Sequence, residues 1–219
     1  MRVTLRDGRG PIGGRRSTRH THAMTRPPAL RLGFVTGATP DKWARTWRER
    51  RSEPLELVPL SETHQEAALR GGEVDMALVR LPVRREALHC VTLYDEVPVV
   101  VASREHFVAA AEGAVTLADL VDEQLVLPHV SGWTPTCPQQ PWPPMSAQEA
   151  IETVAAGTGV AIVPRSIARL HSRKDVVERE VGDLAPTSIG LAWLVERDDE
   201  QTQAFVGVVR GRRAGSSRG

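Results

Sequence analysis

Short apolar runs alternate along the chain with stretches whose apolar residues recur at helical spacing. Residues 146–164, SAQEAIETVAAGTGVAIVP, contain one of each. Ser146 and Glu149 predict a capping box, in which each side chain binds the backbone N–H of the other residue. The apolar stripe that follows consists of Ala147, Ile151, Val154 and Ala155. Gly157 suits the end of this helix, and the apolar run 160–163 predicts a buried strand in a sheet that is at least partly parallel.

The same alternation fills the first third of the chain. Strands are predicted at residues 30–37, 55–60 and 74–82, which are rich in apolar residues. One helix is expected to begin at Thr39 and Pro40, and a second near Ser61 or Thr63. The order βαβαβ is typical of an α/β protein.

Two longer apolar segments are predicted to connect separate lobes. HCVTLYDEVPVVVAS, residues 89–103, is long for one strand and carries Pro98 in its middle, as expected where a strand leaves one sheet and enters another. IGLAWLV, residues 189–195, is the predicted return crossover. We therefore expect lobe I to comprise residues 30–97 and 190–210, and lobe II to comprise residues 98–189.

The remaining elements are short. The predictions are helices at 103–112 and 116–123, a strand at 125–128, a proline-rich loop at 131–144, a helix at 164–170, an edge strand at 176–181 and an acid-capped helix over 198–211 that buries Phe205, Val208 and Val209.

The formal net charge of +1 conceals an uneven distribution of charge. Residues 1–29 carry seven Arg and one Asp, residues 210–219 carry four Arg, and the stretch between them is strongly acidic. We expect residues 1–29 and 211–219 to be disordered, solvated basic tails. Attraction of these tails to nucleic acid or another polyanion is the alternative interpretation.

Several classes of protein are disfavoured by the sequence. No apolar run is long enough to span a bilayer, and the basic N-terminal segment lacks the apolar core of a secretory signal. Two cysteines, Cys90 and Cys137, make a disulfide framework improbable, so a cytoplasmic location is expected. Cys-x-x-Cys and His-Glu-x-x-His spacings are absent, and we expect no metal and no cofactor. His129 and Cys137 invite a nucleophile interpretation, but no orienting third group accompanies them, so no catalytic residue is predicted.

Three segments together resemble one known family: LRLGFVTGATP, LVPLSETHQEAALRGGEVDMALVRLP and AAGTGVAIVPRSIARL. They are similar to the effector-binding domain of LysR-type transcriptional regulators over roughly residues 30–210. The resemblance implies a type 2 periplasmic-binding-protein fold, with two lobes that each have a mixed, mostly parallel sheet flanked by helices and are joined by two crossover strands. Such regulators carry a helix-turn-helix before this domain, whereas the 29 residues here show no helical period. We therefore expect no specific DNA binding by this chain alone.

Ligands of two-lobed α/β proteins bind at the carboxyl ends of strands, where free backbone N–H groups face an anion. The candidate ligand-binding residues that follow strands are Thr36, Gly37, Thr39, Ser61, Arg80, His129, Ser131 and Gly132. A guanidinium such as that of Arg80 can bind a carboxylate through two hydrogen bonds, so a small carboxylate effector is expected. Thr39 and Ser61 as plain helix caps, and Arg80 in a surface ion pair, are the alternatives.

The sequence favours a small-molecule sensor over two other functions. A solute-binding protein of a transport system shares the fold but should carry an export signal, and an enzyme on the same fold would need catalytic groups that are not evident. We also expect a homodimer, because Trp43 and Trp47 lie four apart on an otherwise charged helix. The alternative is that both tryptophans pack on their own sheet.

Overall fold

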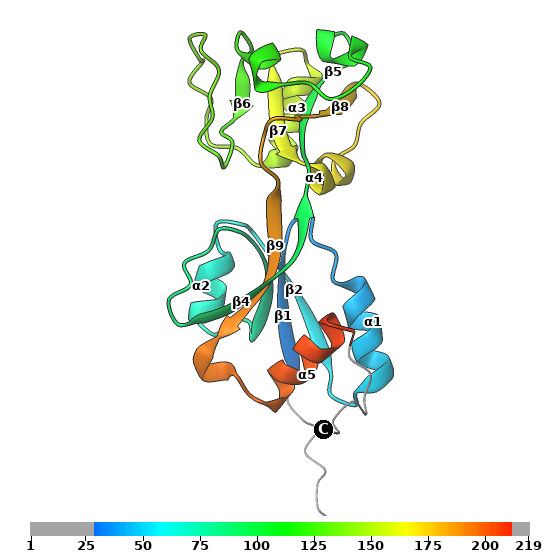
Figure 1. The fold of residues 1–219 in the computed structure, drawn as a ribbon, viewed down its shortest axis with the longest axis vertical. Helices are drawn as coiled ribbons and strands as arrows, with labels where there is room; N and C mark the ends of the chain where they lie inside the picture. The colour runs from blue at the N-terminus through cyan, green and yellow to red at the C-terminus, as the bar shows by residue number, and fades with distance from the viewer. Residues whose placement is uncertain (1–28, 212–219) are drawn as a thin grey trace, which may run out of the picture.

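Two β-sheets, one in each lobe, form the framework of the protein (Figure 1). The computed structural model describes residues 29–211. Sheet A has the strand order β2-β1-β3-β9-β4, and sheet B has the order β6-β7-β5-β8. The strands are β1 (Leu30–Val35), β2 (Leu55–Leu60), β3 (Met76–Arg80), β4 (Leu88–Glu96), β5 (Pro98–Ser103), β6 (Leu125–Leu127), β7 (Val160–Pro164), β8 (Val176–Glu180) and β9 (Thr187–Leu194).

Helices cover both faces of each sheet. The α-helices are α1 (Asp41–Arg50), α2 (Gln65–Arg70), α3 (Ala147–Ala155), α4 (Arg165–Leu170) and α5 (Glu200–Val209), and the 3₁₀ helices are η1 (Phe107–Ala110), η2 (Leu117–Leu120) and η3 (Val195–Arg197). Helices α1 and α5 pack on one face of sheet A, and α2 packs on the other. Helices α3 and α4 pack on one face of sheet B, while η1 and η2 lie over the opposite face.

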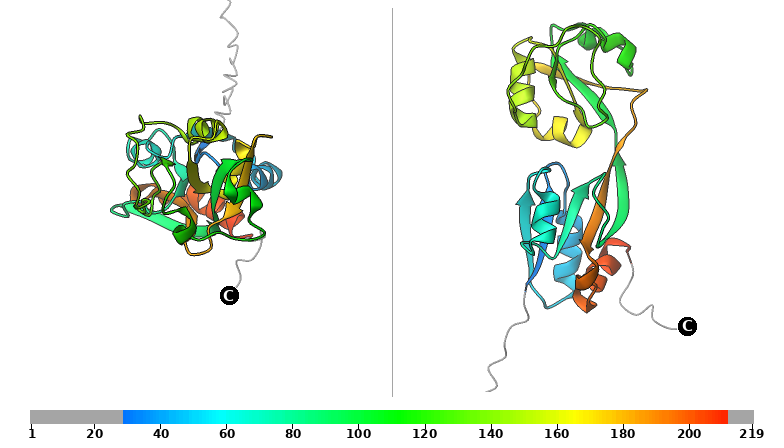
Figure 2. Two further views of the ribbon diagram at one scale, coloured as in Figure 1. Left: turned by 90° about the horizontal axis from the view of Figure 1, so that it is seen from above. Right: turned by 90° about the vertical axis from the view of Figure 1, so that its left-hand side faces the viewer.

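Two crossovers join the lobes, the first at the predicted place and the second before the predicted segment 189–195, nearly all of which lies within sheet A. β4 belongs to sheet A and β5 to sheet B, and only Val97 separates them. The segment that leads into β9 carries the chain back, and β9 joins sheet A from Thr187 onward. Figure 2 shows both connections running along one side of the molecule, with a lobe at each end. The division into lobes at residues 97 and 190 remains a prediction.

The sheets are mixed, as expected, but they contain fewer parallel pairs than "mostly parallel" implies. Parallel pairing joins β1 to β2, β1 to β3 and β6 to β7. The pairs β3–β9, β4–β9, β5–β7 and β5–β8 are antiparallel. The cause is the double crossing, because a chain that leaves sheet A along β4 must return along β9 in the opposite direction.

Side-chain caps define the starts of α3 and α5. Ser146 and Glu149 form the predicted capping box at α3, and Asp199 with Thr202 caps α5. In contrast, the segments at 103–112 and 116–123 form only single 3₁₀ turns, η1 and η2. η2 even begins with a capping box of Thr116 and Asp119, so a capping signal alone does not predict an α-helix.

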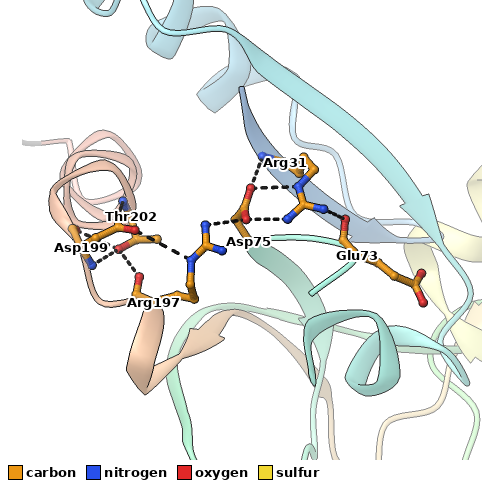
Figure 3. A network of polar contacts seen from close by, with 6 residues as sticks. All are labelled: Arg31, Glu73, Asp75, Arg197, Asp199 and Thr202. Carbon is orange, nitrogen blue, oxygen red and sulfur yellow. Dashed lines mark hydrogen bonds and ion pairs between the residues drawn. The ribbon is translucent and has the colours of Figure 1, made fainter. Parts of the chain in front are cut away.

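A buried carboxylate joins β1 to η3, the turn that precedes α5. Asp75, whose side chain is 3% exposed, lies between Arg31 and Arg197 (Figure 3). Arg31 donates to Asp75 from its backbone N–H, Nε and Nη2, and Arg197 Nη2 donates at 2.7 Å. Burial alone would raise the pKa of Asp75, but hydrogen bonds from Arg31 and the two nearby charges outweigh burial and lower this pKa.

We expect Asp75→Asn to lower the free energy of unfolding by about 2 kcal/mol at neutral pH. Both arginines are partly exposed and keep solvent contact, which limits the cost. The lowered pKa means that the ion pairs contribute fully above the ordinary Asp value of about 4, and that this contribution is lost as the pH falls through the folded-state value. Urea unfolding at pH 7 and in acid should therefore show a mutational difference that shrinks in acid.

Asp122→Asn is the control for that prediction, because Asp122 is an exposed aspartate with no ion pair among the described residues. Its effect should stay within about 0.5 kcal/mol at both pH values. An Asp75→Asn protein as stable as the control would show that the Arg31–Asp75–Arg197 contacts contribute nothing.

Candidate functional site

A cavity of about 360 Å³ lies where the two lobes meet the start of β9. Three segments form its walls: the loop after β3, the loop after β6 and the segment that leads into β9. The lining residues are Leu81, Pro82, Val83, Arg85, His129, Val130, Ser131, Ala185, Pro186, Thr187 and Ser188. We call this cavity the interlobe pocket. Its size falls at the lower end of the range of about 300–1,000 Å³ that is usual for small-molecule sites.

A polar network centred on Arg80 lies behind the pocket. Arg80 is 2% exposed, and its guanidinium contacts the carboxylate of Glu96, which is itself 7% exposed. The same guanidinium donates to Thr187 Oγ1 at 3.3 Å, to Glu62 Oε2 at 3.1 Å and to the Thr36 carbonyl at 3.3 Å. Arg80 therefore binds together the ends of β1, β3 and β4 and the beginning of β9.

Arg80 was predicted to bind the ligand, and this stays a prediction, but its environment differs from the expected one. Its charge is compensated by Glu96, and four of its five N–H groups have acceptors among the described residues, which leaves one Nη2–H for a ligand. The predicted alternative was a surface ion pair, but the observed pair is buried. Arg80 reaches the pocket only indirectly, through the lining residue Thr187.

His129 and Ser131 line the pocket, and their hydrogen bonds define the state of the imidazole. The Ser131 backbone N–H donates to His129 Nδ1 at 3.2 Å, and the Ser131 hydroxyl lies 2.8 Å from the same nitrogen. Ser131 Oγ also accepts from the Trp133 N–H. Nδ1 is therefore an acceptor, and the ring proton of neutral His129 resides on Nε2. Burial lowers the pKa of His129, which favours this neutral form.

The other predicted residues do not line the interlobe pocket. Thr36 and Thr39 are exposed, and the start of α1 has no side-chain cap, so Thr39 does not act as one. The Ser61 hydroxyl contacts Thr63 Oγ1 at 3.2 Å and does not cap α2. Gly132 has a φ of +76° in the turn after His129, so its role is conformational.

Gly37 lies at a direct contact between the lobes. A Cβ atom added to Gly37 would lie 2.5 Å from Ser166 Oγ and 2.9 Å from Ile167 Cδ1, both at the beginning of α4. Its φ of +89° also favours glycine. Close approach of the β1–α1 loop to lobe II explains why glycine is needed here, and a ligand contact is not required.

Sequence reasoning missed four segments or residues that form the pocket: residues 81–83, Arg85, Val130 and residues 185–188. The signal for Arg85 was weak, since it is one of two adjacent arginines in a loop after a buried strand. The segment 185–188 gave no signal, because its role depends on β9 passing between β3 and β4.

The two tryptophans of α1 differ in environment. Trp47 is fully buried, packs on Phe205 of α5 with 5.6 Å between ring centroids, and donates from Nε1 to the Glu53 carbonyl at 2.8 Å. It cannot present a face to a partner, which corrects its predicted interface role. Trp43 is only half-buried. The four-residue spacing placed both on one face, but α5 covers only the second.

Neither a metal site nor a membrane span is present in the part of the chain that the structure describes. Within residues 29–211, no three His, Cys, Asp or Glu side chains gather where they could hold a metal ion. No helix of this region has the length and apolar character needed to cross a bilayer.

The fold and the interlobe pocket together define a two-lobed small-molecule-binding domain. The family model for the LysR substrate binding domain matches residues 29–214, and the chain belongs to this family. The effector-binding domain of a BenM variant superposes with a TM-score of 0.71 at 23% identity, covering 84% of this chain and 94% of that one. The BenM domain with its effector benzoate superposes with a TM-score of 0.69 at 22% identity, covering 84% and 91%.

Relatives of known role are transcriptional regulators. The chain is 28% identical to the HTH-type transcriptional regulator AlsR of Bacillus subtilis (strain 168) over 184 residues, which cover 76% of this chain and 59% of AlsR. It is 28% identical over 202 residues to the Hca operon transcriptional activator HcaR of Escherichia coli (strain K12), covering 84% of this chain and 68% of HcaR. The chain thus spans a little under two thirds of the length of AlsR.

Proposed function

We propose that residues 29–211 sense a small organic acid, bound in the interlobe pocket, and act in transcriptional regulation in the cytoplasm. The observation that carries this proposal is the make-up of the pocket, which takes residues from both lobes and from the start of β9. A ligand in that position would contact both lobes and the start of β9, and would therefore change the relative free energies of different arrangements of the lobes. We propose no catalytic activity for the chain, and no sequence-specific DNA binding by residues 29–211.

Binding should be testable with benzoate, the effector named for the BenM domain, and with a panel of small organic acids. A true ligand at a hundred times its Kd is expected to raise the free energy of unfolding by about 2.7 kcal/mol, which a thermal-shift measurement detects. Ala185→Trp should abolish the shift, because Ala185 lines the pocket and an indole would fill it. Ala118→Trp, at an exposed site on η2, is the matched control. A shift of undiminished size in Ala185→Trp would contradict this location.

We further propose that the domain forms a homodimer, with the half-exposed Trp43 on α1 near the contact and the outer edge of α3 as its counterpart. A symmetric pair of this kind repeats each contact twice. The exposed residues of α1 are mainly charged, so Trp43 is the side chain on this helix best suited to an apolar contact.

A further inference from the structure

Arg85 differs from the other arginines around the interlobe pocket because it has no acidic partner. Arg80 pairs with Glu96 and Glu62, and Arg84 pairs with Glu66 at 3.1 Å. In the region described, 29–211, no carboxylate lies within 4.0 Å of the Arg85 guanidinium. Arg85 is exposed at the pocket wall, so its charge is available to a ligand.

The charges around Arg85 leave the pocket with one excess positive charge. None of the lining residues is an aspartate or a glutamate. Two acids that contact the surroundings of the pocket are already engaged: Asp95 accepts a hydrogen bond from Ser188 Oγ at 2.6 Å, and Glu96 pairs with Arg80. A ligand with a single negative charge would compensate Arg85, whereas a dianion would be left with an uncompensated charge.

His129 adds a second polar group to the lining of the pocket. Its Nδ1 accepts hydrogen bonds from Ser131, which leaves the Nε2–H as the polar group that the ring can offer. Burial lowers the pKa of His129, so the ring stays neutral at neutral pH and adds no second charge. The pocket therefore combines one cation with one neutral N–H donor.

Much of the remaining wall is apolar, beside the hydroxyl groups of Ser131, Thr187 and Ser188. Leu81, Pro82, Val83, Val130 and Pro186 supply the apolar surface, and Val130 is 61% exposed. A volume of 360 Å³ corresponds to about twelve water molecules at ~30 Å³ each. The space suits a compact molecule of roughly that many non-hydrogen atoms, with an apolar body.

We propose that Arg85 selects the ligand, by pairing with the one carboxylate of a compact organic acid whose apolar body packs against the loop after β3 and against Val130. His129 donates a second hydrogen bond to the same carboxylate from Nε2. This inference rests on the proposed binding site and adds to it the anchoring residue, the charge of the ligand and its size.

Calorimetric titration with two matched pairs of probes tests the proposal: benzoate with benzamide, and cyclohexanecarboxylate with its amide. Each acid should bind the wild-type chain at least about tenfold more tightly than its amide, the range expected of a charge-assisted hydrogen bond. Arg85→Gln should raise the Kd of each acid by about ten- to a hundredfold and leave the Kd of each amide unchanged. Arg84→Gln is the control, since it removes the same charge one residue away from an arginine that pairs with Glu66.

Three results would overturn the assignment of Arg85. If Arg84→Gln lowers the affinity for the acids as much as Arg85→Gln does, net charge alone attracts the acids. If acids and amides bind equally tightly, the charge of the ligand has no part in binding. If no probe binds, the proposed ligand class is wrong. Ala185→Trp separates this inference from the site itself. If Ala185→Trp abolishes binding of the acids but Arg85→Gln does not lower their affinity, the interlobe pocket is the binding site and the role proposed for Arg85 is wrong. If Ala185→Trp leaves acid binding intact, the site is wrong.

Discussion

Replacing Glu96 by alanine is expected to lower the free energy of unfolding by about 3–5 kcal/mol, because it leaves the buried guanidinium of Arg80 without its main counter-charge. Arg80 is 2% exposed and cannot reach solvent without disrupting the junction of β1, β3, β4 and β9. Its remaining acidic partner, Glu62, is 46% exposed at the side chain and offers a weaker, solvent-screened contact. Chemical denaturation monitored by circular dichroism measures the change.

A double variant sharpens the interpretation of the Glu96 result. Arg80→Met combined with Glu96→Leu removes both charges and should recover most of the stability lost in the single variant, since two apolar side chains need no counter-charge. Glu105→Ala, at an exposed position with no ion pair within the described part of the chain, should change stability by less than about 0.5 kcal/mol. A Glu96→Ala protein as stable as that control would show that the Arg80–Glu96 pair is dispensable.

Trp47→Ala is expected to cost about 3–5 kcal/mol, as large-to-small changes of buried aromatic residues do. The substitution empties space between α1, α5 and sheet A, loses the ring contact with Phe205, and leaves the Glu53 carbonyl without its indole donor. Urea unfolding should show a lower midpoint with a similar slope.

Trp43→Glu provides the contrast on the same helix. Trp43 is only partly buried, so the change should cost far less stability than Trp47→Ala. If the proposed dimer uses this face, sedimentation of Trp43→Glu should reveal monomers of 24.0 kDa where the wild-type chain sediments as a pair. A wild-type chain that is monomeric at micromolar concentration would contradict the dimer proposal.

Local signals in the sequence predicted most elements of the fold. The capping box at Ser146 and the proline in the middle of residues 89–103 each depend on neighbours within a few residues, and both predictions are confirmed. The apolar run 189–195 was predicted as the return crossover, but nearly all of it lies within sheet A, and the chain crosses before β9. The segments 103–112 and 116–123 were predicted as helices, but only short 3₁₀ turns form within them.

The candidate site could be predicted only in part, because its chemistry depends on contacts between distant residues. Arg80 was chosen as a lone cation after a strand, but its partners Glu96 and Thr187 lie far along the chain and meet it only when β4 and β9 enter the sheet. His129 and Ser131 were found because they follow a strand that ends at the interlobe pocket. Arg85 could not be distinguished from Arg84 without knowing which of them Glu66 pairs with.

The position of β9 between β3 and β4 determines the order in which the two lobes can be completed during translation. Met76 of β3 pairs with Trp193, and Cys90 of β4 pairs with Ala192, so sheet A stays divided until β9 has left the ribosome. All strands of sheet B precede β9 in the chain and can pair earlier. The lobe whose synthesis begins first is therefore the last to close its core, and its apolar strands remain available to chaperones, or to aggregation, for most of the time that the chain is being made.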